Sequence, residues 1–592
     1  MKLLRRHGRS WLVWACLGLG LALFVWRLGS TGLVDETPPL FAASARAMAE
    51  TGDWLTPRVN GLPRYDKPPL VYWLMALGYL LPAQSLWNPL GTWASGMPSA
   101  LACIAVMLTL ALTVERYWGS RLLGLTTALA FALSPLNLLW GRMAVSDALF
   151  SGLLSISLLL FWRTQAWRQG GPHWRGWWHG WLLLGLAVLT KGPVAVVLAG
   201  LTLLGFALSQ GELALQLRGL RAARGLALTA AVALPWYAAE LLVEGKPYWN
   251  SFFGYHNMQR FTSVVNDHLQ PWWFFALMLV VASLPASPLL LLGLWRALRQ
   301  AAPGPEQSLS RFAACWLLVV LAFFTLAATK LPSYWIPATP AAALLIVEAG
   351  SGAAIQRWSR RLAWGLTLLM AALIALVLAL SPLWFGQVTD PEMPGLASAV
   401  LASHDLLRAA ACFGLAALLP LLVRGPKRLL ALQLPLVGFT LLALHPLWAL
   451  GDQLRGAPVR EMAAAASHHR RAREPLAMVG ILKPSLHYYS RQVVLYEGKE
   501  PVDLSNLADR LSHEQRRGQE PSSSRDQPSV LVVIDAGTAA QPHWQGLQPE
   551  RLSQAGLYQL WRLDRRWLEA RARTLAELGY APTWQQPRPE RY

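Results

Sequence analysis

Long apolar runs separated by short polar loops dominate the pattern of the chain. Most runs are long enough for a helix to cross a ~30 Å hydrocarbon layer, which takes about 20 residues. We expect about thirteen membrane-spanning helices, over residues 11–28, 97–115, 121–138, 143–162, 177–191, 193–209, 225–243, 271–295, 312–329, 333–348, 362–385, 404–423 and 428–449. The pattern predicts an α-helical polytopic membrane protein.

One further apolar stretch, Pro69–Leu81, decides the topology. As a helix it would rise only about 20 Å, so we expect a juxtamembrane helix instead of a span. An odd number of spans then places the two termini on opposite sides. The basic start, with Lys2 and Arg5, favours a cytoplasmic N-terminus. Loop 29–96 and everything after residue 450 then lie outside the cytoplasm.

The composition changes after residue 450. Residues 1–450 form the predicted membrane domain, and in 451–592 charged residues become frequent. This second region has three strand-like runs and one helical run: Leu476–Ile481, Gln492–Tyr496, Ser529–Ile534 and Leu568–Leu578. A polar patch, Gln515–Pro528, has a disordered composition. We expect a small extracytoplasmic α/β domain here.

Composition and charge exclude several classes of protein. With 54% hydrophobic and 14% charged residues, the chain is not an ordinary soluble protein. The net charge of +20 comes from basic residues between the apolar runs, where they set topology, so we expect no nucleic-acid partner. The four cysteines lie in apolar runs without paired spacing, which indicates neither disulfides nor a thiolate metal site.

Asp35 and Glu36 stand directly after the first span. A carboxylate pair this close to the bilayer is costly unless it lines a watery site. Thr37 is a natural N-cap, and the prolines after it suit a first helical turn, so we expect a helix over Leu40–Ala49. The pair either assists this helix start or supplies a general base or a metal-coordinating carboxylate.

Later in the same loop, Tyr65, Asp66 and Lys67 bring an acid and a base together where the chain returns to the bilayer. A lysine ammonium can bind phosphate as a point charge, and the carboxylate can take a cation. The alternative is an ion pair in which Lys67 extends toward the interface.

The outer loop at about 244–270 holds His256 and Arg260, which a helix would place on one face. Imidazole suits a metal or a proton transfer, and guanidinium suits phosphate. Taken alone, His256 could equally be a surface residue.

Other charges lie at the outer ends of spans: Arg142, Asp147, Lys191 and Lys330. Each can anchor its span at the interface. Asp147 lies inside an apolar run, where a carboxylate needs a partner or a water-filled cavity.

Six ordered motifs carry a family resemblance. They are DET at 35–37, TGDW at 51–54, YDKPPLVYW at 65–73, LTKGP at 189–193, HNMQRF at 256–261 and TKLPSYWIPATPA at 329–341. Over residues 10–450 the chain resembles bacterial GT-C glycosyltransferases, above all the 4-amino-4-deoxy-L-arabinose lipid A transferases and their cousins among the protein mannosyltransferases. The arabinose transferases also carry a C-terminal outer domain.

The resemblance implies a GT-C fold in the bacterial inner membrane, with a periplasmic C-terminal domain. It implies transfer of a sugar, with inversion, from a polyprenyl-phosphate donor to a lipid A-like or other acceptor at the outer face. By motif position, Asp35 would be the catalytic base or the acid that positions the acceptor. From residue chemistry alone, Asp147 is the second candidate for the base. If the acceptor is a phosphate, it needs no base, and Asp35 would orient it.

The resemblance also assigns binding residues. Lys67 and Arg260 would hold the donor phosphate. Beyond the resemblance, we expect Lys330 and Tyr334 of the TKLPSY motif to bind this phosphate as well, and Glu36, Tyr65, Arg142 and Lys191 to support the site. Asp66 and His256 correspond to ligands of a divalent metal, which would be Zn, Mg or Mn. The family has glutamate at the position of Asp66, so this chain's side chain is one methylene shorter.

Three other functions stay open at this point. A protein O-mannosyltransferase would share the motifs. A flippase or transporter of lipid-linked sugars would place ionisable groups near the bilayer midplane and show repeated halves, and we see no repeat. An inactive scaffold would have lost Asp35 or Lys67, and both are present. We expect a monomer that works with a lipid or protein acceptor.

Overall fold

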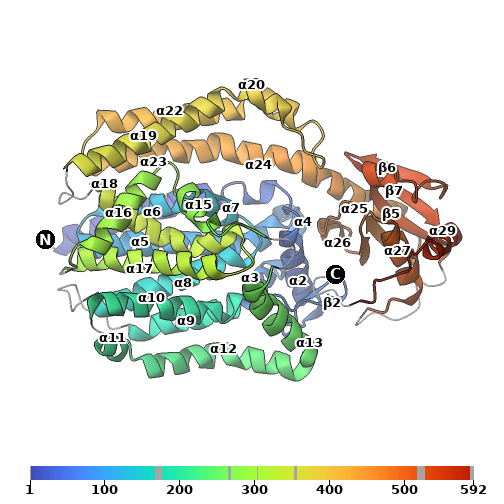
Figure 1. The fold of residues 1–592 in the computed structure, drawn as a ribbon, viewed down its shortest axis with the longest axis horizontal. Helices are drawn as coiled ribbons and strands as arrows, with labels where there is room; N and C mark the ends of the chain where they lie inside the picture. Colours follow the sequence, from blue (N-terminus) through green and yellow to red (C-terminus); the bar gives the residue numbers. More distant parts are fainter. Residues whose placement is uncertain are drawn as a thin grey trace.

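A computed structural model describes residues 2–166, 176–211, 213–264, 269–302, 304–351, 357–516 and 527–586. Its helices run along the long axis of the molecule, and a sheet domain covers one end of the bundle (Figure 1). α1 begins at the opposite end (Figure 1). The sides of the membrane on which the two termini lie stay a prediction.

The bundle is built from helices of very different lengths. Its first half comprises α1 (Lys2–Gly20), α5 (Thr92–Trp118), α6 (Arg121–Ala132), α7 (Pro135–Trp140), α8 (Ser146–Gln165), α9 (Trp177–Lys191), α10 (Val194–Gln210), α11 (Leu213–Gly219) and α12 (Ala222–Glu244). Its second half comprises α15 (Phe274–Val281), α16 (Ser287–Arg299), α17 (Pro305–Leu326), α18 (Thr339–Ser351), α19 (Arg357–Ala379), α20 (Ser381–Trp384), α21 (Leu396–Ser403), α22 (Asp405–Leu422), α23 (Lys427–Phe439) and α24 (His445–Gly451).

Within the described residues, eight helices are long and apolar enough to cross a membrane. Shorter apolar helices, among them α6 and α10, lie beside them. The protein is therefore a multi-pass membrane protein, as predicted. The number of about thirteen spans stays a prediction, because several predicted spans correspond to these shorter helices.

Several predicted spans are interrupted, among them 271–295 and 333–348. The expectation of one helix over 271–295 is wrong: α15 ends at Val281 and α16 begins at Ser287. Pro285 and Pro288 lie at the break, where proline lacks the amide donor that a helix interior needs. Over 333–348, the 3₁₀ helix η5 (Pro332–Ala338) precedes α18.

The first outer loop folds as a compact unit. α2 (Thr37–Thr51) has the predicted prolines in its first turn, but the predicted N-cap at Thr37 is wrong: Thr37 is the first helical residue, and Glu36 is at the N-cap. The helix ends at Gly52, whose φ of +74° suits glycine. A hairpin of β1 (Arg58–Val59) and β2 (Leu62–Pro63) follows. α3 (Leu70–Tyr79) confirms the short helix expected over Pro69–Leu81, and α4 (Gln84–Trp87) completes the loop.

The second long outer connection carries three short helical segments. They are α13 (Lys246–Tyr248), the π-helix η4 (Trp249–Gln259) and α14 (Arg260–Thr262). This connection brings His256 and Arg260 back over the bundle.

The C-terminal domain has a five-stranded sheet in the order β4-β3-β5-β7-β6. Its elements are β3 (Leu476–Val479), α26 (Ser485–Ser490), β4 (Val494–Glu497), α27 (Pro501–His513), β5 (Ser529–Asp535), α28 (Ala536–Ala539), β6 (Glu550–Ala555), β7 (Tyr558–Asp564) and α29 (Arg565–Glu577). β3, β4 and β5 are parallel, and the β5–β7 and β7–β6 pairs are antiparallel. The predicted α/β domain is confirmed.

Alternating side chains divide the sheet into two buried faces. Ala477 and Val479 of β3 pack with α27 and α29, whereas Leu476 and Met478 pack with α25 (Ala457–His469) and α26. This period of two is what a sheet covered on both faces requires.

One continuous helical segment connects the two domains. Residues 427–469 run as a single stretch from α23 to α25, so the predicted boundary at 450 falls inside it. α25 therefore belongs both to the end of the bundle and to one face of the sheet.

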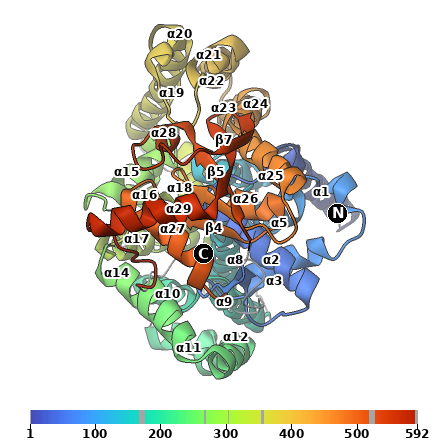
Figure 2. The ribbon, with the colours of Figure 1, turned by 90° about the vertical axis from the view of Figure 1, so that its right-hand side faces the viewer.

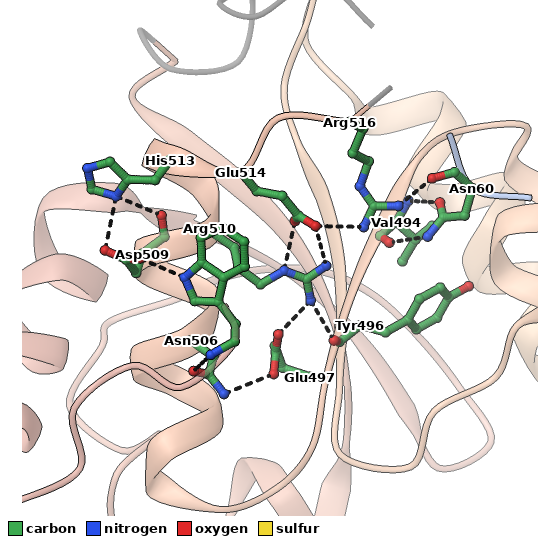
Figure 3. Close-up of polar contacts among 11 residues, drawn as sticks. Asn60, Val494, Tyr496, Glu497, Asn506, Asp509, Arg510, His513, Glu514 and Arg516 are labelled. Atoms are coloured by element: carbon green, nitrogen blue, oxygen red, sulfur yellow. Dashed lines mark hydrogen bonds and ion pairs between the residues drawn. The ribbon is translucent and has the colours of Figure 1, made fainter. Parts of the chain in front are cut away.

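A buried polar network joins the sheet domain to the first outer loop (Figure 3). The Arg510 side chain is fully buried and forms two ion pairs. Its Nη1 lies 2.5 Å from Glu497 Oε1, and its Nε lies 2.7 Å from Glu514 Oε2. Beside it, Asn60 of the hairpin pairs with the backbone of Val494 in β4, through two hydrogen bonds of 2.8 Å (Figure 3). End-on, the sheet domain lies in front of the bundle, with α2 and α3 beside it (Figure 2).

Candidate active site

A cavity of about 1010 Å³ lies between the first outer loop and the outer ends of the bundle helices. It gathers most of the predicted site residues: Asp35, Glu36, Asp66, Lys67, Asp147, Lys191, His256, Arg260 and Tyr334. These residues are spread over 300 positions in sequence, so their meeting supports the assignment of a common site.

Asp35 lies between the two domains. Its carboxylate accepts hydrogen bonds from the backbone N–H of Ser485, at 2.9 Å, and from the Ser485 hydroxyl, at 2.5 Å. Burial raises the pKa of Asp35 to about 6, although both bonds from Ser485 and the charges of Lys483 and Arg455 oppose the rise. A carboxyl with this pKa is mostly ionised at neutral pH and takes up a proton readily.

Asp66 lies at the centre of a rigid polar cluster. Arg64 Nη2 donates to its Oδ2 at 2.6 Å, and the Tyr72 hydroxyl donates to its Oδ1 at 3.1 Å. Burial alone would raise the pKa of Asp66, but the charges of Arg64 and Lys67 outweigh it and hold that pKa well below its usual range. Asp66 is therefore a permanent anion.

Lys67 belongs to the same cluster. Its Nζ donates to the backbone oxygen of Asp66 at 2.9 Å and lies 3.7 Å from Oδ2. Burial lowers the pKa of Lys67 to about 8; Asp66 raises it, while Arg260 and Lys191 lower it further. Several cations thus share one partly buried space, which favours an anionic ligand.

Asp147 is paired inside the cavity wall. Lys191 Nζ donates to its Oδ1 at 2.7 Å. The same ammonium lies 5.0 Å from the ring centre of Tyr334 and 5.4 Å from that of Phe150. Asp147 has the partner that a carboxylate at this depth needs.

Part of the cavity lining is apolar. It includes Val194, Val197, Phe261, Phe323, Phe324 and Leu331, which we call the apolar wall; the Phe323 ring packs against those of Phe261 and Phe324. An ionic cluster beside such a wall fits an amphiphile with a phosphate head and a hydrocarbon tail.

His256 and Asp66 are close enough for their charges to interact. Burial and the charge of Lys67 hold the pKa of His256 well below its usual range, so the ring is neutral. The divalent metal at these two residues stays a prediction. Both oxygens of Asp66 already accept hydrogen bonds, one from a guanidinium, and the described residues hold no group of three His, Cys, Asp or Glu side chains suited to a metal.

Three predicted residues lie beside the cavity instead of lining it. The Tyr65 hydroxyl donates to Glu244 at 2.6 Å, Arg142 Nη1 to the Leu23 carbonyl at 3.2 Å, and Lys330 Nζ to the Ala327 carbonyl at 2.8 Å. Because the Lys330 ammonium is hydrogen-bonded to its own loop, a contact with a donor phosphate would require its side chain to move.

Sequence reasoning missed three residues of the site. Arg64 lines the cavity, Tyr72 orients both Arg64 and Asp66, and Ser485 holds Asp35. Tyr72 belongs to the same YDKPPLVYW motif as Asp66 and Lys67, and this shared motif could have pointed to it. Ser485 had none, because it lies 450 positions from its partner.

Comparisons with known proteins show which families the chain resembles. The model for the dolichyl-phosphate-mannose-protein mannosyltransferase family matches residues 66–238, and the model for the C-terminal domain of cyanobacterial RgtA-type glycosyltransferases matches residues 469–579. The crystal structure of ArnT from Cupriavidus metallidurans bound to undecaprenyl phosphate is similar over 93% of this chain and 98% of that one, with a TM-score of 0.75 and 22% identity. The chain therefore has an ArnT-like GT-C fold with a C-terminal sheet domain.

Proteins similar in sequence to this chain are aminoarabinose transferases. The undecaprenyl phosphate-alpha-4-amino-4-deoxy-L-arabinose arabinosyl transferase of Pseudomonas aeruginosa (strain UCBPP-PA14) is 33% identical over 385 residues, which are 63% of this chain and 66% of that protein. An enzyme of the same name, numbered 2, from Pseudomonas fluorescens (strain Pf0-1) is 29% identical over 58% of this chain and 60% of that protein. The matched region thus spans less than two thirds of either relative. The chain is a relative of the aminoarabinose transferases, and the predicted resemblance is confirmed.

Proposed function

We propose that this protein is a glycosyltransferase that moves a sugar from a polyprenyl-phosphate donor to a lipid A-like acceptor at the periplasmic face of the bacterial inner membrane. The observation that carries the proposal is the cavity itself. It joins a cluster of cations, an apolar wall and a carboxylate of raised pKa in one space.

The cation cluster suits the donor phosphate. The charges of Arg260 and Lys191 lower the pKa of Lys67, and an anion placed among these cations relieves that repulsion. When the bond between the sugar and the phosphate breaks, negative charge grows on the phosphate, and preorganised cations stabilise it. The polyprenyl tail would lie along the apolar wall.

Asp35 suits the role of general base. With a pKa of about 6 it is ionised at neutral pH and can accept the proton of an acceptor hydroxyl. The acceptor oxygen then forms the new bond to the anomeric carbon from the face opposite the phosphate, which inverts the configuration. For a phosphate acceptor, which is already ionised, Asp35 would orient the attacking oxygen.

The metal that the family resemblance suggests has no step in this mechanism. The described contacts of Asp66 are those of an ion-pair scaffold, in which Arg64 and Tyr72 fix the carboxylate beside Lys67. In our proposal Asp66 and His256 shape the phosphate pocket.

A protein O-mannosyltransferase is the second candidate. The mannosyltransferase family model covers residues 66–238, which include Lys67, Asp147 and Lys191. We favour a lipid acceptor because the arabinosyl transferases match a longer part of the chain. A flippase is disfavoured because the cations gather at one end of the bundle, whereas transporters bind near the midplane.

Reconstitution tests the proposed function. The purified protein in nanodiscs is given undecaprenyl-phosphate aminoarabinose and lipid A, and products are followed by mass spectrometry. We expect a lipid A mass increase of one aminoarabinose and release of undecaprenyl phosphate. Absence of both products, or sugar transfer to a peptide acceptor alone, would contradict the proposal.

The variant Lys67→Ala tests the phosphate pocket in the same assay. Losing one charge-assisted contact to phosphate should raise the donor KM about tenfold or more. Lys67→Arg keeps the charge and is the matched control. If both variants have the wild-type KM, Lys67 does not bind the donor.

A further inference from the structure

The short helix α26 is the main contact between the C-terminal domain and the first outer loop. Besides Ser485, three of its six residues reach that loop. His487 Nε2 accepts from the backbone N–H of Asn60 at 3.0 Å, the Tyr488 carbonyl accepts from Arg46 at 2.8 Å, and the Tyr489 hydroxyl accepts from the Leu33 N–H at 2.9 Å. The helix therefore holds the loop that carries both Asp35 and Lys67.

The fit around α26 is close. The Tyr488 and Tyr79 hydroxyls are 2.8 Å apart, and the Arg46 guanidinium lies 4.2 Å from the centre of the Tyr488 ring. Gly91 has a φ of +80°, and a Cβ at this position would collide with the Tyr488 hydroxyl. The loop thus leaves room for α26 at a point where any larger residue would push it away.

Ser485 makes the contact that matters for chemistry. Its N–H and hydroxyl each bind a different oxygen of Asp35, so the plane of the carboxylate is fixed from the C-terminal domain. Ser485 is only 1% exposed. A buried hydroxyl of this kind holds its partner in one orientation.

Other charged and titratable groups face Asp35 from neighbouring elements. Lys483 and Arg455 are the nearby cations, and each forms an ion pair with Glu392, at 2.8 and 2.6 Å. The charge of Asp35 also helps to raise the pKa values of Tyr496 and Tyr558. These groups come from the C-terminal domain, the helix leading into it and the loop before α21, so the surroundings of Asp35 are built at the junction of the two domains.

We propose that Ser485 is the positioning residue of Asp35, and that the C-terminal domain is therefore a working part of the active site. This inference rests on the proposed function. Ser485 leaves one face of the carboxylate for the acceptor and favours the ionised form that accepts its proton. Removing the hydroxyl leaves the backbone bond, so Asp35 stays near its place but binds its proton more tightly.

The test compares Ser485→Ala with wild type over a range of pH in the reconstituted transfer assay. Loss of one hydrogen bond to a carboxylate should move the ascending limb of kcat/KM upward by about one pH unit. We therefore expect kcat/KM to fall about five- to tenfold below pH 6 and to return to within about twofold of wild type at pH 8.5. Ser485→Thr, which keeps the hydroxyl, should restore the wild-type limb.

Ser490→Ala is the matched control. Ser490 lies on the same helix, is 4% exposed, and accepts from the Gln492 N–H at 3.3 Å without reaching Asp35. It should leave the pH profile unchanged. An equal loss in Ser485→Ala at every pH, or a wild-type profile for it, would overturn the positioning role.

A second readout does not depend on transfer. The folded-state pKa of Asp35 is raised, so the stability linked to it is present at low pH and is lost as the pH rises through about 6. In Ser485→Ala this loss should extend to about pH 7 in thermal unfolding. Wild type without transfer activity would contradict the proposed function, whereas identical unfolding profiles of the two proteins would contradict the role of Ser485.

Discussion

Two aspartates, Asp35 and Asp66, line the same cavity, and their surroundings shift their pKa values in opposite directions. The Asp35 carboxyl has a pKa raised to about 6, and the pKa of Asp66 is held below its usual range. Asp66 is buried and Asp35 is half-buried, and burial alone raises the pKa of both carboxyls, so burial does not explain the difference. The partners do: Asp35 receives neutral donors from Ser485, whereas Asp66 has a guanidinium 2.6 Å away and an ammonium beside it.

The difference separates chemistry from scaffolding. A group that gives and takes protons needs a pKa near the working pH, and Asp35 has one. A permanent anion can instead fix cations in place, as Asp66 does for Arg64 and Lys67. The two roles also have different origins, since the partners of Asp66 are local in sequence and those of Asp35 come from the other domain.

The largest effect is expected for Asp35→Asn. Asparagine cannot take the proton, so turnover should fall about 10²- to 10⁴-fold, the usual contribution of a general base. The melting temperature should stay the same or rise, because the neutral amide replaces a carboxylate whose ionised form burial penalises. Activity in nanodiscs and thermal unfolding in detergent check the two effects.

Glu36→Gln is the control for that variant. Glu36 also lines the cavity but is exposed, and its loss should change turnover less than about threefold. Equal losses in both variants would mean that the cavity needs negative charge in general. An Asp35→Asn protein that keeps wild-type turnover would remove the distinction between the two aspartates.

The next effect is expected for Asp66→Asn and falls on stability. Removing one partner of a buried ion pair leaves the Arg64 charge uncompensated, at a cost of about 3–5 kcal/mol. The melting temperature should drop clearly at pH 7. Because the folded pKa of Asp66 is lowered, its stabilisation is present above the unfolded pKa of about 4 and is lost as the pH falls. An unchanged melting temperature would show that Asp66 is not the scaffold described here.

Much of the fold was predictable from the sequence, because span length and charge distribution follow from the properties of the bilayer. α2 had the prolines after Thr37 in its first turn, and β3 and β5 lay where their apolar runs predicted. The break between α15 and α16 was missed because the span was predicted from the length of its apolar run, although Pro285 and Pro288 signal the break. β6 and β7 were missed because neither is a continuous apolar run like those of β3 and β5.

The site was predictable only as far as its motifs reached. Asp66, Lys67 and Arg260 were identified from residue chemistry and the family resemblance, and the structure places them in one cavity. The hydrogen-bond and ion-pair partners of a residue decide its role, and the sequence did not show these partners. Arg64 resembles an ordinary loop cation until Tyr72 and Asp66 surround it, and Ser485 belongs to no motif.

The pH dependence of kcat/KM for wild-type transfer tests the central claim most directly, because it reports ionisations of the free enzyme. A base at Asp35 predicts an ascending limb near pH 6, with activity proportional to the ionised fraction. That limb should disappear in the residual activity of Asp35→Asn. A flat profile between pH 5 and 7, or a limb that persists in Asp35→Asn, would contradict the assignment of Asp35 as the base.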